Sequence, residues 1–199
     1  MNLKPEDTIA NYPMQVNMNG VDYNIRTMTV DDGQAMLEFA TSLPPHDVLF
    51  MRRNIAEQAG IDKWVSDLQA GRIYSVLALG GDKIVGYSTI HLTELDWTQH
   101  VAELRVSVSP DARNSGLGRT LVREAFKLAV TLGVEIITSR MTPDQTSARA
   151  LFEELGFRNE AILKDHMKDG AGEYHDLLVM AVNVDEFLAR KQAFGMGSE

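Results

Sequence analysis

The residues with the clearest capacity for chemistry lie in one short stretch, from Arg113 to Arg119. Gly116 and Gly118 lack a Cβ, so the backbone can turn tightly there and bring its N–H groups against an anion. A helix predicted to begin at this point adds the positive end of its dipole, and the two arginines add fixed positive charge. The stretch is therefore expected to bind phosphate groups. The simpler alternative is a tight connection with solvated arginines.

Two predicted elements position this loop. Residues 100–109 are rich in β-forming side chains and predict a strand before the loop. Residues 116–132 follow it and predict an amphipathic helix that Gly133 ends. The apolar residues that recur at helical spacing are Leu117, Leu121, Val122, Ala125, Leu128, Ala129 and Leu132. These side chains are expected to face the core, while the first turn of the helix faces the anion.

The strand, loop and helix start together carry a recognisable motif. The segment Val106-x-Val108-x-Pro110-x-x-Arg113-x-x-Gly116-Leu117-Gly118 resembles the coenzyme A signature of the GNAT superfamily of N-acetyltransferases, commonly written Arg/Gln-x-x-Gly-x-Gly/Ala. The resemblance implies that acetyl-CoA is the co-substrate and an amine the acceptor. In this family the loop amides bind the pyrophosphate, and the preceding strand pairs with the pantetheine arm as if it were another strand.

The resemblance also assigns the cofactor contacts residue by residue. It places the pantetheine arm on Val106, Ser107 and Val108. It places the phosphates on Arg113, Asn114, Ser115, Gly116, Leu117, Gly118 and Arg119.

A second segment, Ala148-Arg-Ala-Leu-Phe-Glu-Glu-Leu-Gly-Phe157, resembles the next helix of the family. Gln145 stands where the family usually has Asn. Thr142 and Gln145 also have the spacing of a capping box, with a proline between them at the first helical position. Gln145 is therefore expected to cap the helix, and contact with the coenzyme is the second interpretation.

Phe152 departs from the family pattern at a position where many members carry a tyrosine that protonates the departing thiolate. A phenyl ring cannot donate that proton. A thiolate with a reference pKa of about 8.5 is still a tolerable leaving group, so transfer without this acid is chemically feasible. Tyr87 and Tyr174 are alternative hydroxyl donors in predicted strands, to which the sequence assigns no role.

Glu103 is the candidate general base. A lysine-like amine has a reference pKa of about 10.4 and must lose a proton before it attacks at neutral pH. Glu103 lies on the same predicted strand as the pantetheine contacts, and by resemblance it matches a glutamate that some GNAT enzymes use as base. The alternative is an ion pair with Arg105, two residues along the same strand face, which would lower the pKa of Glu103.

The chain contains no cysteine, which excludes a cysteine nucleophile, disulfides and thiolate metal sites. The expected mechanism is therefore direct attack of the amine on the thioester in a ternary complex. The strand amide near Val106 or Val108 would polarise the carbonyl. The histidines do not have metal-binding spacing, so no metal is expected. The four histidines in question are His91, His100, His166 and His175, of five in the chain.

The order of predicted elements indicates a mixed α/β (α+β) domain. A strand at 21–28 and a helix at 32–41 precede two short helices within 46–69, interrupted at Gly60, and a hairpin over 73–92. After the central strand, loop and helix come a strand at 134–140, a helix at 144–155 and strands at 157–167 and 174–183. By resemblance these elements form a mostly antiparallel central sheet of about seven strands, flanked by helices on both faces.

The predicted domain organisation is simple. Residues 1–20 are interpreted as an extended leader, 21–184 as the GNAT acetyltransferase domain and 185–199 as a C-terminal helix or tail. A length of 199 residues fits one core and one site. GNAT folds often dimerise, so a homodimer is left open.

The overall charge limits the classes of partner. The chain carries a formal net charge of −9, with a pI near 5.0, so it repels polyphosphates and no nucleic-acid partner is expected. The first ten residues contain acids and a proline where a secretory signal needs a basic start and an apolar run. No apolar stretch is long enough to cross a membrane. The expected location is cytoplasmic, without membrane contact.

Two other functions compete with acetyl transfer. A nicotinamide-binding reading of Gly116-x-Gly118 lacks the third glycine of that motif. A non-catalytic sensor of acyl-CoA is the stronger alternative, because Phe152 replaces the usual acid. The acceptor is left open between a small amine and a protein lysine or N-terminus. The segments expected to shape its pocket, 46–69 and 168–172, carry no recognisable code.

Overall fold

The structure is a computed structural model that describes residues 11–48, 51 and 54–193. Its centre is one eight-stranded sheet in the order β1-β2-β3-β4-β5-β6-β8-β7. The strands are β1 (Met14–Met18), β2 (Val21–Thr27), β3 (Ile73–Gly80), β4 (Lys83–Leu92), β5 (Val101–Val108), β6 (Ile136–Met141), β7 (Arg158–Lys168) and β8 (Tyr174–Asn183). All neighbours are antiparallel except β5 and β6. This is the predicted mixed fold, and the described strands do not form the doubly wound parallel sheet of a dinucleotide-binding domain.

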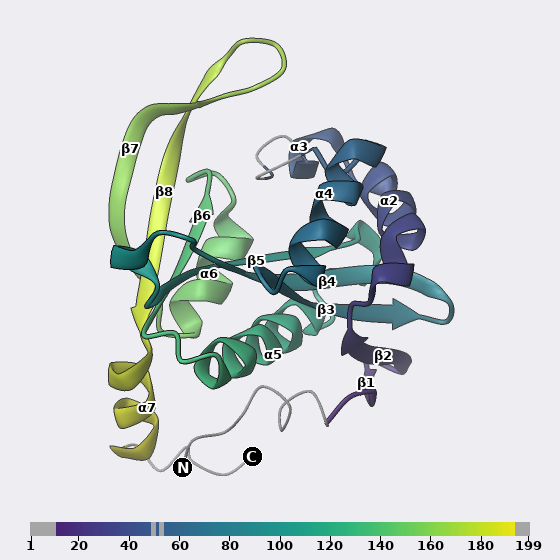
Figure 1. Cartoon of the computed structure of the whole chain (residues 1–199), viewed down its shortest axis with the longest axis horizontal. Helices are drawn as coiled ribbons and strands as arrows, with labels where there is room; N and C mark the ends of the chain where they lie inside the picture. Colours follow the sequence, from purple (N-terminus) through teal and green to yellow (C-terminus); the bar gives the residue numbers. More distant parts are fainter. Residues whose placement is uncertain (1–10, 49–50, 52–53, 194–199) are drawn as a thin grey trace.

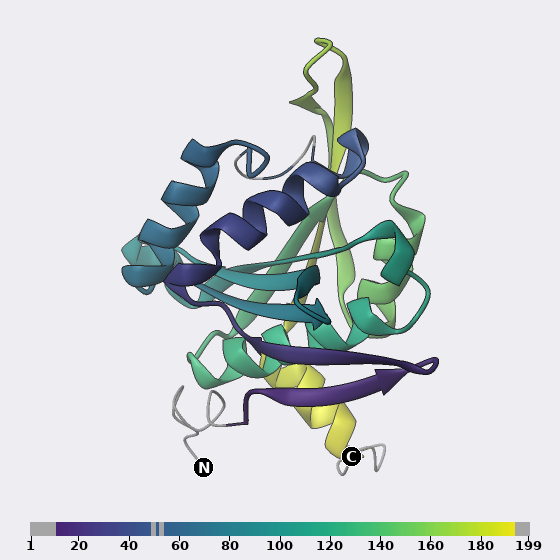
Figure 2. The same ribbon diagram turned by 90° about the vertical axis from the view of Figure 1, so that its right-hand side faces the viewer.

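Helices cover both faces of the sheet, as expected (Figures 1 and 2). One face carries α2 (Gly33–Ser42) and α4 (Gln58–Gln69), with the short α3 (Pro45–Val48) between them. The other face carries α5 (Leu117–Thr131) and α6 (Thr146–Glu154), and α7 (Val184–Ala193) follows the last strand. Of the helices in the described ranges, none is long and apolar enough to cross a membrane.

Each face has its own apolar core. On one face, Met36 and Phe39 of α2 and Trp64 of α4 pack against β3 and β4. Under α5 and α6, Leu104 and Ile137 pack against the helices. The alternation of β5 explains this division, because Ala102 and Leu104 are buried while Glu103 between them faces the opposite side. Adjacent β5 residues therefore serve different faces of the sheet.

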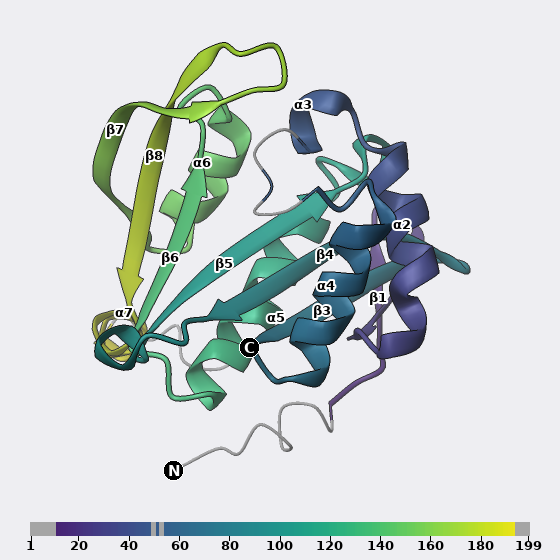
Figure 3. The same ribbon diagram turned by 45° about the horizontal axis from the view of Figure 1, so that its top comes forward.

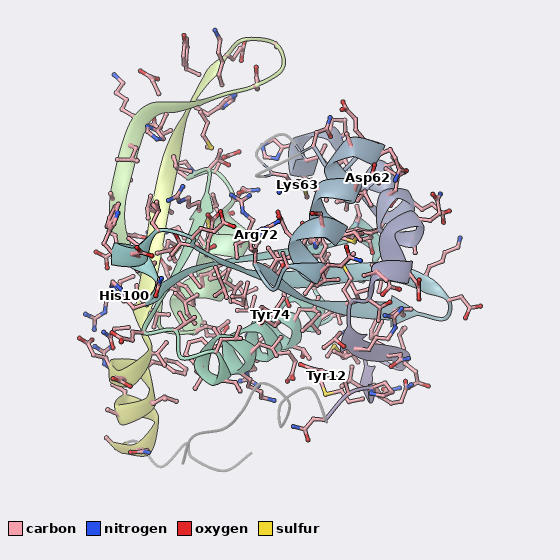
Figure 4. The ribbon with its side chains drawn as sticks, viewed as in Figure 1. Tyr12, Asp62, Lys63, Arg72, Tyr74 and His100 are labelled. Carbon is pink, nitrogen blue, oxygen red and sulfur yellow. The ribbon has the colours of Figure 1, made fainter. Side chains whose placement is uncertain are left out.

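The sheet begins earlier than the sequence interpretation placed it. Residues 14–18 form β1 rather than an extended leader, and they pair with β2 from Met14↔Ile25 to Met18↔Val21. Asn19 and Gly20 make the turn with φ of 53° and 82°. Asn-Gly between alternating apolar residues is a strong hairpin signal, which accounts for the extra strand. Just before β1, the hydroxyl of Tyr12, labelled in Figure 4, donates a 2.8 Å hydrogen bond to Glu124 of α5.

The helical region after α2 also differs from the expectation. Gly60 does not interrupt a helix but lies in the first turn of α4. A Cβ at this position would come within 1.9 Å of the Asn54 carbonyl oxygen. Gly60 is therefore required by a close backbone approach, which the sequence does not distinguish from a helix break.

Candidate active site

The sheet opens into a fork between β5 and β6. β5 pairs with β4 along its length, from Ala102 to Val108. It pairs with the parallel strand β6 only at Val101, Ala102 and Glu103. Beyond Glu103 the two strands diverge (Figure 3). Within the described ranges, the later β5 residues have no ladder partner on the β6 side, so an extended amide-bearing ligand can pair with this edge.

A cleft of about 1860 Å³ follows the fork from the loop after β5 to the space beneath α3 and α4. Nearly all the site residues predicted from the sequence line it. They are Glu103, Val106, Ser107, Val108, Arg113, Asn114, Ser115, Gly116, Gly118, Arg119, Gln145 and Phe152. The exception is Leu117, whose side chain is fully buried in the core. Only its backbone remains near the loop, where its N–H donates to the Ser115 hydroxyl over 3.2 Å.

The glycine loop has the backbone that an anion site needs. Asn114 and Gly116 adopt left-handed conformations, with φ of 58° and 93°, just before α5 begins. At Gly116 a Cβ would meet nothing within 4 Å, so the conformation rather than the space favours glycine. At Gly118 a Cβ would make ordinary contacts of 3.6 Å with Leu151 and 3.7 Å with Val108. The protein's own packing therefore does not require Gly118, whereas a ligand lying against this turn would.

The two arginines of the loop pair with acids at the rim of the cleft. Arg113 forms an ion pair with Asp47 of α3 and donates from Nε to the Val108 carbonyl over 3.2 Å. Arg119 pairs with Glu154 of α6. Both guanidiniums are nearly half exposed, so these pairs are weak and a phosphate can replace the acids.

Gln145 occupies the N-cap position of α6, where its side chain caps none of the helix N–H groups, so the predicted capping box that begins at Thr142 is only half formed. Its side-chain oxygen accepts a 3.3 Å hydrogen bond from the Thr142 N–H, which is the reciprocal half of a capping box. Phe152 is buried on the same helix, edge-on to Phe157 with ring centroids 4.9 Å apart. The ring reaches the cleft wall without bringing a proton donor to it.

Glu103 lies at the point where the fork begins, and its side chain is 11% exposed. Arg105 donates to its Oε1 from Nε over 2.7 Å, and Arg140 of β6 has its Nε 4.0 Å from Oε2. Burial alone would raise the pKa of Glu103, but the charges of Arg105 and Arg140 outweigh it and the pKa lies below its ordinary value. The ion pair considered from the sequence is therefore present.

Two further residues of β4 reach the same part of the cleft. His91 is buried and lies directly opposite Glu103 in the strand register. Tyr87 is also buried, and its hydroxyl contacts the Met51 sulfur at 3.7 Å. Burial raises the pKa of Tyr87 to about 12, so the hydroxyl stays protonated at neutral pH. Tyr174, in contrast, is 62% exposed on the hairpin and does not line the cleft.

The sequence predicts no functional role for His91, because the spacing of the histidines is not that of metal ligands. No local pattern reveals its position, which depends on the antiparallel pairing of β4 with β5 that sets His91 against Glu103. Within the residues that the structure describes, no group of three or more His, Cys, Asp or Glu is arranged to hold a metal ion.

A fork between parallel strands, followed by a glycine loop and a helix N-terminus, defines a class of protein that binds an extended ligand with a phosphate end. The family described as "Acetyltransferase (GNAT) family" matches residues 37–157, more than half of the chain. The chain belongs to this family.

Two curated relatives have assigned acceptors. A ribosomal-protein alanine N-acetyltransferase from Salmonella typhimurium is 32% identical over 79 residues, which cover 40% of this chain and 53% of that protein. A spermidine N(1)-acetyltransferase from Vibrio cholerae is 26% identical over 104 residues, which cover 52% of this chain and 60% of that protein. The matches therefore span little more than half the length of these relatives.

Solved structures share the fold. The yncA putative acetyltransferase from Salmonella typhimurium, solved with acetyl-CoA, has a TM-score of 0.72 at 20% identity and covers 85% of this chain and 95% of its own. A putative acetyltransferase from Acinetobacter baylyi has a TM-score of 0.73 at 16% identity, covering 82% and 93%. At these identities the likeness concerns the fold alone.

Proposed function

We propose that the protein transfers the acetyl group of acetyl-CoA to a primary amine. The observation that carries this proposal is the fork: the open edge of β5 leads directly into the left-handed turn of the glycine loop. Together they offer backbone partners to an amide-bearing arm and N–H groups to its phosphates. Membership of the acetyltransferase family supports the same reaction.

The residues present fit acetyl-CoA. Val106, Ser107 and Val108 carry the open strand edge for the pantetheine arm. Gly116 and Gly118 allow the phosphates to approach the backbone, with Arg113 and Arg119 beside them. The cleft continues past the fork to the β4 and α4 side, which leaves room for a second substrate. The acetyl group would then lie between the loop and the acceptor.

The proposed reaction is direct attack. The amine nitrogen uses its lone pair to form a bond with the thioester carbonyl carbon, the carbon–sulfur bond breaks, and coenzyme A leaves as the thiolate. The nitrogen loses one proton and the thiolate gains one. Phe152 supplies no proton, so water or a neutral hydroxyl such as that of Tyr87 provides it. Backbone N–H groups of β5 near Val106 or Val108 stabilise the developing oxyanion.

Glu103 is proposed to accept the amine proton, directly or through water. Its lowered pKa keeps it ionised at neutral pH, which attracts an ammonium group but makes it a weak base. Proton transfer is therefore expected to depend on the supply of neutral amine and to become faster as the pH rises. His91, opposite Glu103, is the neighbouring group through which a proton can leave.

Calorimetric titration with acetyl-CoA tests the cofactor site. The intact protein should bind with a micromolar dissociation constant, and the Arg113→Ala/Arg119→Ala variant should bind at least about 10-fold more weakly because two phosphate contacts are lost. Arg123→Ala removes an exposed arginine of α5 outside the cleft and should bind like the wild type. No binding by the intact protein would overturn the proposal.

An acyl-CoA sensor without catalysis is the alternative that Phe152 raises. It shares the cofactor site, so binding does not distinguish the two. Release of coenzyme A that depends on an amine would exclude the sensor, and tight binding without turnover across an amine panel would favour it.

A further inference from the structure

Arg140 lies on the acceptor side of the fork. On β6 the residues Ile137, Ser139 and Met141 are buried toward α5 and α6, whereas Arg140 alternates to the other face. Its side chain is 51% exposed and lines the cleft opposite Glu103 of β5. The guanidinium therefore projects into the space that an acceptor must enter to reach the fork.

The other cationic side chains along the described part of the cleft are already held by acids. Lys63 and Arg72, which lie on the same side of the sheet in Figure 4, both bind Asp67 Oδ1, at 2.9 and 2.6 Å. Arg113 and Arg119 pair with acids of α3 and α6. Arg105 contacts Glu103 Oε1 through both Nε and a terminal nitrogen, at 2.7 and 2.6 Å.

Arg140 differs from all of these. Its nearest acid in the described residues is Glu103, and the 4.0 Å between Arg140 Nε and Glu103 Oε2 exceeds a hydrogen bond. A guanidinium has five N–H donors in a fixed fork that matches a carboxylate. Within the described residues, the guanidiniums of Arg105 and Arg140 thus lie beside the same carboxylate, in a protein of net charge −9.

We infer that the acceptor is an amine that carries its own carboxylate, of the free α-amino acid class, and that Arg140 binds this carboxylate. The inference rests on the proposed acetyl transfer and names its substrate class. In an α-amino acid the ammonium and the carboxylate are bonded to one carbon. The two opposite charges therefore have a spacing that suits the neighbouring side chains of Glu103 and Arg140. The amine lies toward Glu103 at the fork, and the carboxylate lies toward Arg140.

Other amines fit this arrangement less well. A polyamine brings further positive charges next to Arg105 and Arg140, where like charges repel. A lysine side chain or a protein N-terminus carries no carboxylate beside its amine. Glu103 is taken by the reacting amine, and Asp67 and Glu94 are paired with Arg72, so these acids do not offer a site for a second ammonium group.

The test compares amino acids with their carboxamides, for example methionine, phenylalanine and alanine in both forms, together with spermidine. The rate constant kcat/KM should be about 10-fold higher for the acid than for the carboxamide, the effect of a charge-assisted bidentate contact. The carboxamide amine has the lower pKa, so its larger neutral fraction works against this result.

Arg140→Ala should reduce the acid-to-carboxamide ratio to about 1, and Arg140→Lys should give an intermediate ratio because it keeps the charge but loses the fork. Arg123→Ala, outside the cleft, should keep the wild-type ratio. Thermal unfolding of each variant checks that the fold is retained.

Equal rates for acids and carboxamides, or a preference for spermidine, would overturn the inference and leave acetyl transfer intact. The same holds if Arg140→Ala lowers both rates equally, or if it weakens acetyl-CoA binding about 10-fold, since Arg140 would then serve the cofactor. No transfer to any amine would contradict the proposed function itself.

Discussion

The loop end of the cleft is built from consecutive residues, Arg113 to Arg119, whereas the acceptor end is assembled from β4, β5, β6 and α4. At the loop end the arginines lie at an exposed rim and pair with acids that a phosphate can replace. At the acceptor end a buried carboxylate is shared by two arginines from different strands. The loop end can thus be formed by one short segment of the sequence, while the other end depends on how distant strands align.

Glu103→Gln tests the acceptor end and should have the largest effect. We expect kcat/KM for any accepted amine to fall about 100-fold at pH 7, because the group that receives the proton is lost. The loss should be smaller near pH 10, where neutral amine is abundant. Rates over this pH range, with Glu160→Gln on the exposed strand β7 as the control, provide the measurement. Equal loss at both pH values would assign Glu103 to positioning of the arginines alone.

Gly118→Ala tests the loop end. Because an added Cβ meets only ordinary contacts with the protein, the fold should be retained, and helix propensity should raise stability by up to about 1 kcal/mol. Acetyl-CoA binding should weaken by about 10-fold or more, since the same Cβ crowds the ligand. Calorimetry and thermal unfolding measured together separate the two effects. Unchanged affinity would show that the ligand does not approach this turn.

Asp32→Asn tests the framework that carries the acceptor-side helices. Asp32 accepts two hydrogen bonds from Arg26, at 2.7 and 2.6 Å, and one from the Thr29 N–H at 2.7 Å. Burial alone would raise the pKa of Asp32, but these contacts outweigh it and the pKa is lowered from 3.8. The substitution should cost about 2 kcal/mol of unfolding free energy at pH 7.

The pH dependence of this effect has a defined sign. A carboxyl whose pKa is lowered on folding stabilises the protein above its unfolded pKa, and this stability is lost as the pH falls through the folded pKa. The difference between wild type and Asp32→Asn should therefore shrink below about pH 3.8. Denaturant unfolding at pH 7 and pH 3, with the exposed Asp31→Asn as control, measures it. A difference that stays constant would exclude the ion pair as the cause.

Asp47→Asn should have the smallest effect of these substitutions, and it should strengthen acetyl-CoA binding where Gly118→Ala weakens it. It releases Arg113 from its exposed ion pair, so acetyl-CoA should bind up to about 3-fold more tightly. Asp62→Asn on α4, outside the cleft, serves as the control. Weaker binding in Asp47→Asn would mean that Asp47 positions Arg113 for the phosphate instead of competing with it.

The sequence predicted the parts of the molecule that are local. The loop motif and the following helix depend on neighbouring residues, and the structure places both as expected, whereas the next helix begins only at Thr146, beyond the predicted capping box. Leu117 shows a limit of motif reasoning, since its side chain is buried in the core although it belongs to the glycine-loop motif. Residues 14–18 alternate too weakly to predict a strand by themselves, and it is the Asn19-Gly20 turn that pairs them with β2.

The acceptor end could not be predicted in the same way. The approach of Arg140 to Glu103 depends on the parallel register Glu103↔Thr138, which no local pattern encodes. The position of His91 opposite Glu103 depends likewise on pairing between strands. Sequence reasoning named Arg105 as the partner of Glu103 because two residues along one strand share a face.

Acetyl transfer to an amine is tested most directly by a single-turnover reaction with isotopically labelled acetyl-CoA. The protein is mixed with the labelled thioester and a panel of amino acids, amino-acid amides and polyamines, and the products are quantified by mass spectrometry. We predict one labelled N-acetylated amine for each coenzyme A released, without acetylated protein as an intermediate. Bound acetyl-CoA that stays intact with every amine would contradict this account, and a kinetically competent acetylated protein would contradict direct attack.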